Sequence, residues 1–187
     1  MKKQAIFLLA LSGALSGSLH AEDMSTLKAE GKGVIKGFFK ELKGELMKAK
    51  KAGGPIAAVK ACNTKAPGIA KNASKNGWDV ARTSLKLRNE DNAPDQWELK
   101  VLKQFEARKA KGESPEKIAY AEIVSDNGKR TFRMMKAIPT AELCITCHGT
   151  KVKPEIINAL NKHYPNDKAK GFKVGDIRGA FTLKKAL

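Results

Sequence analysis

Five consecutive residues, Cys144-Ile145-Thr146-Cys147-His148, constrain this chain more than any other segment. The pattern C-x-x-C-H is the attachment sequence of c-type haem. Its two thiols can each add to one vinyl group of the porphyrin, and the adjacent histidine then projects toward the iron from the same side. The pattern occurs once in the sequence, which predicts one covalently bound haem with His148 as an iron ligand.

Two other uses of the motif are less favoured. A thioredoxin-type disulfide would follow a strand and open a long helix within a βαβ pattern, whereas here a short segment leads into Gly149 and Lys151. A zinc site would need a second pair of ligands, and downstream of the first 21 residues the only other histidine is His163.

Cys62 is the third cysteine, and a bond to Cys144 or Cys147 would block haem attachment. Because it lies in an alanine-rich helical stretch, one interpretation is a buried structural thiol. The other is a second axial ligand, since thiolate binds haem iron and the nearby Lys60 and Lys65 would favour the deprotonated form. Four other side chains compete for that position: Met47, Met134, Met135 and His163. The adjacent methionines lie in an expected strand, so only one of them could reach the haem.

The N-terminus has the order of a signal peptide. Lys2 and Lys3 precede an apolar run, and small residues lead to a cleavage site after Ala21. We therefore expect residues 1–21 to be removed, residues 22–187 to form a single periplasmic domain, and no later segment to span a membrane. The formal charge of +17 indicates attraction to acidic partners such as a redox protein. Nucleic acid is excluded as a partner by export.

The hydrophobic pattern predicts helices first and strands later. Apolar residues at helical spacing predict a long helix over 23–51, which Gly53-Gly54 ends, and a second helix from Pro55 to about Pro67 that resumes to Ser74. Alternation predicts strands at 78–88 and 176–183 and a hairpin over 118–138 that turns at 126–128. Further helices are expected after Pro94 and Pro154. This order is typical of an α+β fold, an antiparallel sheet with helices on one side.

Four blocks of sequence together resemble a known family. They are Ala61-Cys62-Asn63-Thr64 with Pro67; 82–89 (RTSLKLRN) with 92–95 (NAPD) and Trp97-Glu98; 144–149 (CITCHG); and 175–180 (GDIRGA). They resemble a family of bacterial extracytoplasmic c-type haem domains. The family includes a photosystem-associated cyanobacterial haem protein, and the same domain also occurs in sensor proteins. The resemblance implies a PAS-like antiparallel sheet with long N-terminal helices, covalent haem, and axial ligation by His148 and Cys62.

Three arginines in these blocks are candidates for binding the haem propionates. Guanidinium groups bind carboxylates well and often bidentately, and Arg82, Arg88 and Arg178 are placed to do so if the blocks meet in the fold. Each could equally be a surface arginine at a strand edge. Arg130 and Arg133 are weaker candidates.

Two functions fit the sequence about equally. In the first, the chain is a redox or diatomic-gas sensor in which Cys62 leaves the iron on reduction and CO or NO takes its place. In the second it is a soluble electron carrier that docks to acidic redox partners. An enzyme is not expected, because it would need acid–base groups over an open iron position, and nothing in the sequence places His163 there.

Overall fold

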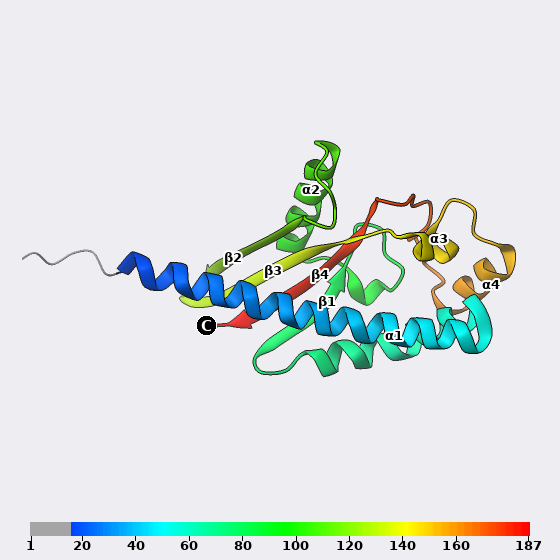
Figure 1. The fold of residues 1–187 in the computed structure, drawn as a ribbon, viewed down its shortest axis with the longest axis horizontal. Coiled ribbons are helices and arrows are strands. Elements are labelled where there is room, and N and C mark those ends of the chain that lie inside the picture. Colours follow the sequence, from blue (N-terminus) through cyan, green and yellow to red (C-terminus); the bar gives the residue numbers. More distant parts are fainter. Residues whose placement is uncertain (1–15) are drawn as a thin grey trace, which may run out of the picture.

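The computed structural model describes residues 16–187, with side chains from Met24 onward (Figure 1). Its elements are α1 (Ser16–Ala73), β1 (Trp78–Thr83), the short 3-10 helix η1 (Glu90–Asn92), α2 (Gln96–Ala110), β2 (Ala119–Asp126), β3 (Lys129–Pro139), α3 (Glu142–His148), α4 (Pro154–His163) and β4 (Ile177–Ala186). The expected signal peptide, 1–21, falls on residues whose side chains lie outside the described part, so it stays a prediction.

α1 consists of two helical halves joined by a sharp bend. Gly53 and Gly54 leave helical geometry, with φ/ψ of −155°/25° and 70°/−164°, and Pro55 opens the second half, as the sequence predicted. The two halves run back along each other (Figure 1). The expected break at Pro67 is wrong, because the helix continues through this residue to Ala73. Ala66 and Ile69 are buried on either side of the exposed proline, so tertiary packing holds this turn helical.

Four strands form one antiparallel sheet in the order β1-β4-β3-β2. The predicted turn of the β2–β3 hairpin is confirmed, since Asn127 and Gly128 both have positive φ, 48° and 78°. The first strand is shorter than expected and ends at Thr83. The next residue, Ser84, ends it: its hydroxyl accepts a hydrogen bond from the Lys86 N–H (3.2 Å), so the chain turns instead of continuing the ladder.

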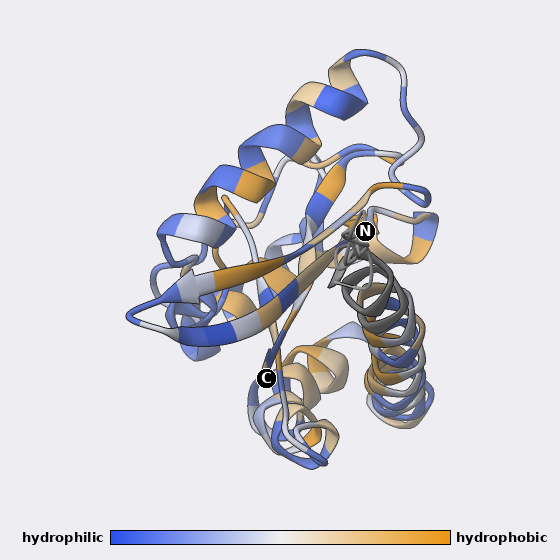
Figure 2. Cartoon of the chain, turned by 90° about the vertical axis from the view of Figure 1, so that its left-hand side faces the viewer, coloured by the Kyte–Doolittle hydropathy of each residue, from blue (hydrophilic) through white to orange (hydrophobic). Residues whose placement is uncertain are grey.

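Helices cover both faces of the sheet, which corrects the expectation of helices on one side. On one face Leu27, Ile35 and Phe38 of α1 pack on the sheet in a core that includes Met134 and Leu183. On the other face α2 contributes Val101, Leu102 and Phe105, which pack with Ile118, Met135 and Ala137. Seen along the long axis, the sheet lies between these two helices (Figure 2). The α+β class with an antiparallel sheet is confirmed.

The α2 face of the sheet also holds a polar cluster. Asp95 caps α2 in a capping box with Glu98, and the buried Glu98 accepts a hydrogen bond from Thr182 Oγ1 (2.7 Å). Arg133 binds Asp95 (2.6 Å) and stacks over Trp97, 4.1 Å from the ring centroid. Arg133 therefore anchors α2 to the sheet and is not available for a ligand on the α1 face.

Gly179 allows β4 to pass against the end of β1. A Cβ atom at this position would overlap the carbonyl oxygen of Thr83 and come within 3.0 Å of Ser84 Cβ. We expect Gly179→Ala to lower the free energy of unfolding by about 1–3 kcal/mol, because two backbone segments would have to separate. Urea denaturation measures this, with Gly68→Ala, where a Cβ meets nothing within 4 Å, as the control. Equal stability of the two variants would contradict the close approach.

No helix within residues 16–187 has both the length and the apolar character needed to cross a bilayer.

Candidate cofactor site

A cavity of about 800 Å³ lies between the two halves of α1, the sheet and the start of α3. This volume is within the range of ligand and cofactor sites. Its apolar lining includes Ile35, Leu42, Leu46, Ala66, Ile69, Met134, Ile138 and Phe181. The charged residues of the lining are mostly positive. The cations are Lys32, Lys36, Lys43, Lys65, Lys117, Lys136 and Arg82, and the acids are Glu45 and Glu116. A cavity of this kind suits a large apolar ligand that carries negative charge.

The two cysteines of the C-x-x-C-H segment lie on α3, which directly follows β3 and is seven residues long. Cys144 lines the large cavity. Cys147, three residues later, packs against a small core of Val59, Ile156, Leu160 and Tyr164. None of the three cysteines is paired with another in a disulfide.

Cys62 lies on the second half of α1 and lines the same cavity as Cys144. Burial raises the pKa of its thiol, and the positive charges of Arg82 and Arg88 offset this only in part. The cations that offset burial at this thiol are these two arginines and not Lys60 and Lys65, which the sequence analysis considered. The neighbouring Asn63 donates from Nδ2 to the carbonyl of His163 (3.2 Å), which ties this turn of α1 to the end of α4.

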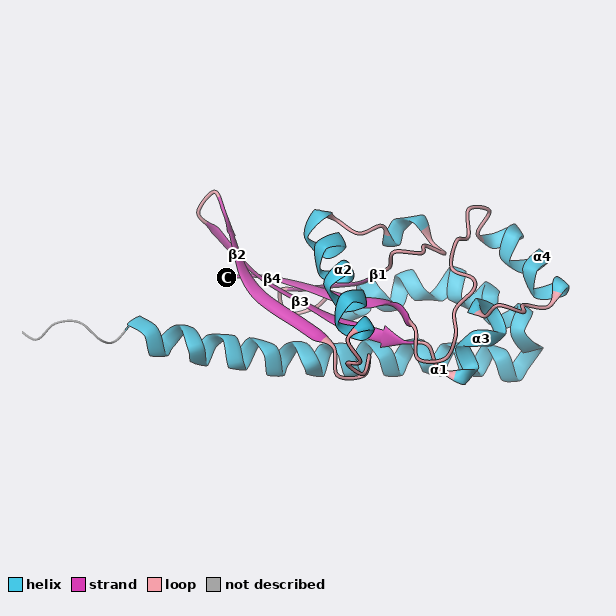
Figure 3. Ribbon diagram, turned by 90° about the horizontal axis from the view of Figure 1, so that it is seen from above, coloured by secondary structure: helices cyan, strands magenta, loops and turns pink. Residues whose placement is uncertain are grey.

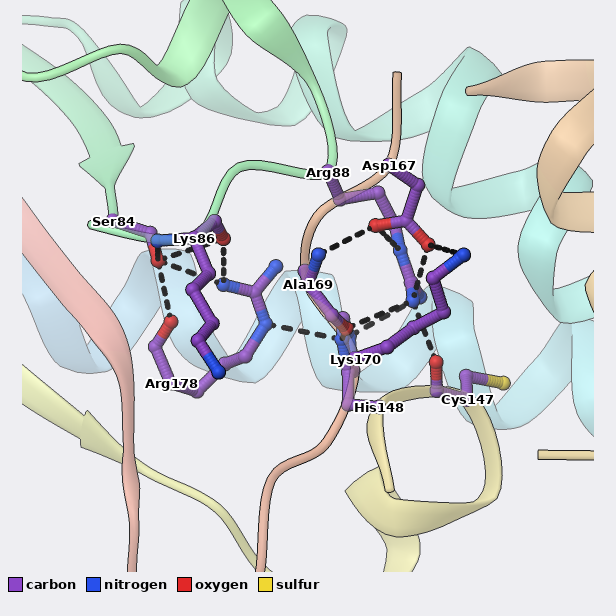
Figure 4. Close-up of polar contacts among 9 residues, drawn as sticks. All are labelled: Ser84, Lys86, Arg88, Cys147, His148, Asp167, Ala169, Lys170 and Arg178. Carbon is purple, nitrogen blue, oxygen red and sulfur yellow. Dashed lines mark hydrogen bonds and ion pairs between the residues drawn. The ribbon is translucent and has the colours of Figure 1, made fainter. Parts of the chain in front are cut away.

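His148, at the end of α3, is held as a neutral imidazole of defined tautomer. Its Nδ1 lies 2.8 Å from the carbonyl oxygen of Ala169 and must donate to it, since a carbonyl only accepts (Figure 4). Nε2 therefore carries the lone pair and accepts from Nη1 of Arg88 (3.3 Å). Arg178 Nε lies 3.1 Å from Nδ1 but cannot donate to a nitrogen that already carries the proton. Burial, and then the charges of Arg178 and Arg88, lower the pKa of His148 well below its usual value.

Arg88 is fixed by a buried carboxylate that the sequence analysis missed. Its Nε and Nη2 donate to the two oxygens of Asp167 at 3.2 and 3.1 Å, and Nη2 also donates to the carbonyls of Cys147 and Ala169 (Figure 4). The side chains are only 11% and 1% exposed. Nothing in the sequence marks Asp167, which stands among lysines 79 residues from its partner. The pair clamps the end of α3 to the segment after α4.

The other two candidate arginines have no counter-charge. Arg82 makes no hydrogen bond or ion pair with any side chain or carbonyl in the described part of the chain, and burial lowers its pKa. Arg178 donates from Nη1 to the neutral oxygens of Ser84 (3.0 Å) and Lys86 (3.3 Å). Burial, together with the charges of Arg88 and Arg82, lowers its pKa to about 10. Two partly buried guanidinium groups are thus left without a carboxylate in contact.

Apart from Cys147, the predicted cofactor-binding residues line one or both of two adjoining cavities. Cys62 and Cys144 line the large one, while His148, Arg88 and Arg178 line a smaller one of about 110 Å³, and Arg82 lines both. The adjacent methionines point to opposite faces as predicted: Met134 lines the large cavity, and Met135 is buried beneath α2. Met47 is exposed on α1. Neither His163 nor Arg130 is among the residues that line the two cavities.

Among the side chains that the structure describes, those of residues 24–187, no three from His, Cys, Asp or Glu converge to hold a metal ion by themselves.

The fold and this site together define an α+β domain with a large apolar cavity, and a C-x-x-C-H helix forms part of the cavity wall. The chain belongs to the Tll0287-like family, whose sequence model matches residues 18–185. In fold it is similar to the crystal structure of the cyanobacterial heme-protein Tll0287, with a TM-score of 0.60 and 24% identity over 84% of this chain and 95% of that one. Among curated proteins no sequence matches this chain.

Proposed function

We propose that this chain is a monohaem c-type haem protein, with the porphyrin in the large cavity and thioether bonds to Cys144 and Cys147. One observation carries the proposal: the C-x-x-C-H helix opens onto an apolar, positively lined cavity of about 800 Å³. Membership of the Tll0287-like family, and the fold shared with a protein described as a heme-protein, support it. The bound haem would supply an iron that takes up and releases one electron.

The uncompensated arginines fit the charge of this cofactor. Haem carries two propionates, and Arg82 and Arg178 are two partly buried guanidinium groups without a carboxylate partner. Arg88 is neutralised by Asp167. We therefore assign charge compensation of the propionates to Arg82 and Arg178, and assign Arg88 to holding the segment that carries His148. The three arginines, which the sequence analysis gave one common role, are thus assigned two different roles.

His148 and Cys62 are the proposed iron ligands. The hydrogen bond from Nδ1 to Ala169 leaves Nε2 of His148 with its lone pair, which is the arrangement an iron-binding histidine needs. Coordination through Nε2 would replace the hydrogen bond from Arg88 Nη1, while the bonds of Arg88 to Asp167 can persist. Cys62 lies on the cavity wall formed by the second half of α1. Met134 lines the same cavity from the sheet, so it remains the alternative to Cys62 as the second axial ligand.

The role we favour is redox or diatomic-gas sensing in the periplasm, with release of Cys62 on reduction. Cys62 is well placed for this, since it belongs to the second half of α1 and Asn63 connects that turn to α4. Movement of the cysteine would therefore displace both α1 and α4. Such a two-state change in helix position is a kind of change that a partner protein can recognise. Electron transfer to an acidic partner is the second candidate, and the formal charge of +17 favours it.

Absorption spectra of Cys62→Ala test the ligand. We expect covalent haem to be retained and the ferric spectrum to change spin state, because the sixth ligand is lost. Met134→Leu is the control and should leave the ferric spectrum as in the wild type. A ferric spectrum that changes in Met134→Leu and not in Cys62→Ala would identify the methionine as the ligand.

Spectra of the reduced wild type under CO separate the two roles. A prompt Soret shift would mean that the sixth ligand leaves on reduction, in favour of sensing. A reduced spectrum indifferent to CO would mean that both axial ligands stay, in favour of electron transfer.

A further inference from the structure

Lysines follow one side of the first half of α1. Lys28, Lys32, Lys36 and Lys40 recur every four residues, so they are neighbours on the helix surface, and all are exposed. None of them forms an ion pair with a side chain that the structure describes. Like charges four residues apart destabilise a helix by about 0.2–0.5 kcal/mol per pair. The fold therefore tolerates a repulsion that an external anion would relieve.

These lysines continue into the mouth of the large cavity. Lys32, Lys36 and Lys43 line it from α1, and Lys65 and Lys117 line it from the second half of α1 and the segment before β2. At the centre of the α1 lysines stands Phe39, which is 47% exposed. Its ring meets the buried Phe181 edge-on at 5.9 Å, and Lys43 Nζ lies 6.0 Å from it. We call Lys32, Lys36, Phe39 and Lys43 the mouth patch.

We propose that the mouth patch is a docking surface for an acidic protein. Protein–protein interfaces commonly place aromatic residues inside a polar rim. The polar groups around Phe39 are lysines, so the complementary partner is acidic. A bilayer surface fits less well, because a membrane-binding helix needs a continuous apolar face. The apolar face of α1, with Leu27, Ile35 and Phe38, is buried on the sheet. The docking surface itself does not depend on the proposed function. Its biological role does, since docking there would bring the partner close to the proposed haem.

The test compares two variants of equal net charge. In the first, Lys32, Lys36 and Lys43 are replaced by Gln. In the second, Lys100, Lys103 and Lys129 are replaced by Gln; these are exposed, lie on α2 and at the β2–β3 turn, and do not line the cavity. The probe is oxidised plant-type ferredoxin, a small acidic protein, titrated into the ferric holoprotein by calorimetry at low ionic strength. Haem content is measured separately by absorption, so loss of haem would count against the proposed function and not against docking.

We expect the dissociation constant to rise about tenfold for the mouth-patch variant and less than about twofold for the control, because local charge governs docking. The difference should vanish at about 0.5 M salt, where charges are screened. Equal weakening in both variants, or no binding by the wild type, would overturn the proposal. So would cosedimentation of the wild type, but not the mouth-patch variant, with phosphatidylcholine vesicles that contain about a third phosphatidylglycerol, since the occupant would then be lipid.

Discussion

Replacement of both Cys144 and Cys147 by serine is expected to abolish covalent haem attachment completely. Serine hydroxyls do not add to the porphyrin vinyl groups, and the two thiols of α3 are the only ones in C-x-x-C-H spacing. Haem staining of the denatured protein on a gel, and the intact mass of the protein co-expressed with a cytochrome c maturation system, measure the result.

Cys62→Ser is the matched control for this experiment. Cys62 lines the same cavity as Cys144 but lies outside the motif, so its replacement should leave the covalent haem in place. Covalent haem that persists in the double variant, or a wild type that acquires none under the same conditions, would remove the basis of the proposed function.

The second large effect is expected at Asp167. In Asp167→Asn the guanidinium of Arg88 would stay buried without its counter-charge, beside Arg82 and Arg178, which have none either. Breaking a buried pair in this way costs about 3–5 kcal/mol of folding free energy. Asp167 Oδ1 also accepts the Ala169 N–H (2.9 Å), which helps to position the carbonyl that binds His148. Urea denaturation of the holoprotein measures the loss.

Asp176→Asn provides the comparison. Asp176 pairs with Lys109 at 2.6 Å, but both side chains are about a third exposed (31% and 32%), and such pairs are worth about 0–1 kcal/mol. Similar small losses in the two variants would mean that Arg88 finds water or another partner. A shift in the Soret band of Asp167→Asn, absent in Asp176→Asn, would show that the clamp also positions His148.

Several features of the fold follow from local sequence. The bend at Gly53-Gly54 and Pro55, the Asn127-Gly128 turn and the periodic faces of α2 and α4 depend on residues within a few positions of one another. The conformational preferences of glycine, proline and asparagine, and the spacing of apolar residues, are enough to predict them. Membership of the family was also predictable, because its motifs are short and contiguous.

Other features depend on contacts that no local pattern records. Pro67 stays inside a helix because Ala66 and Ile69 are buried by the rest of the fold. Helices lie on both sides of the sheet (Figure 3). Met134 and Met135 face different cores. Sequence alternation shows that two faces exist, but which helix covers each face depends on the path of the whole chain.

The site shows the same division. The sequence by itself determined the thiol pair, the adjacent histidine, the upstream cysteine and the three candidate arginines, because each stands in a recognisable block. Only the tertiary structure decided how the arginines differ: Arg88 meets Asp167 across 79 residues, whereas Arg82 and Arg178 are partly buried with no carboxylate in contact. It also decided that burial outweighs nearby cations at Cys62. The physical reason is that charge pairing and desolvation depend on distance in space, which sequence separation does not give.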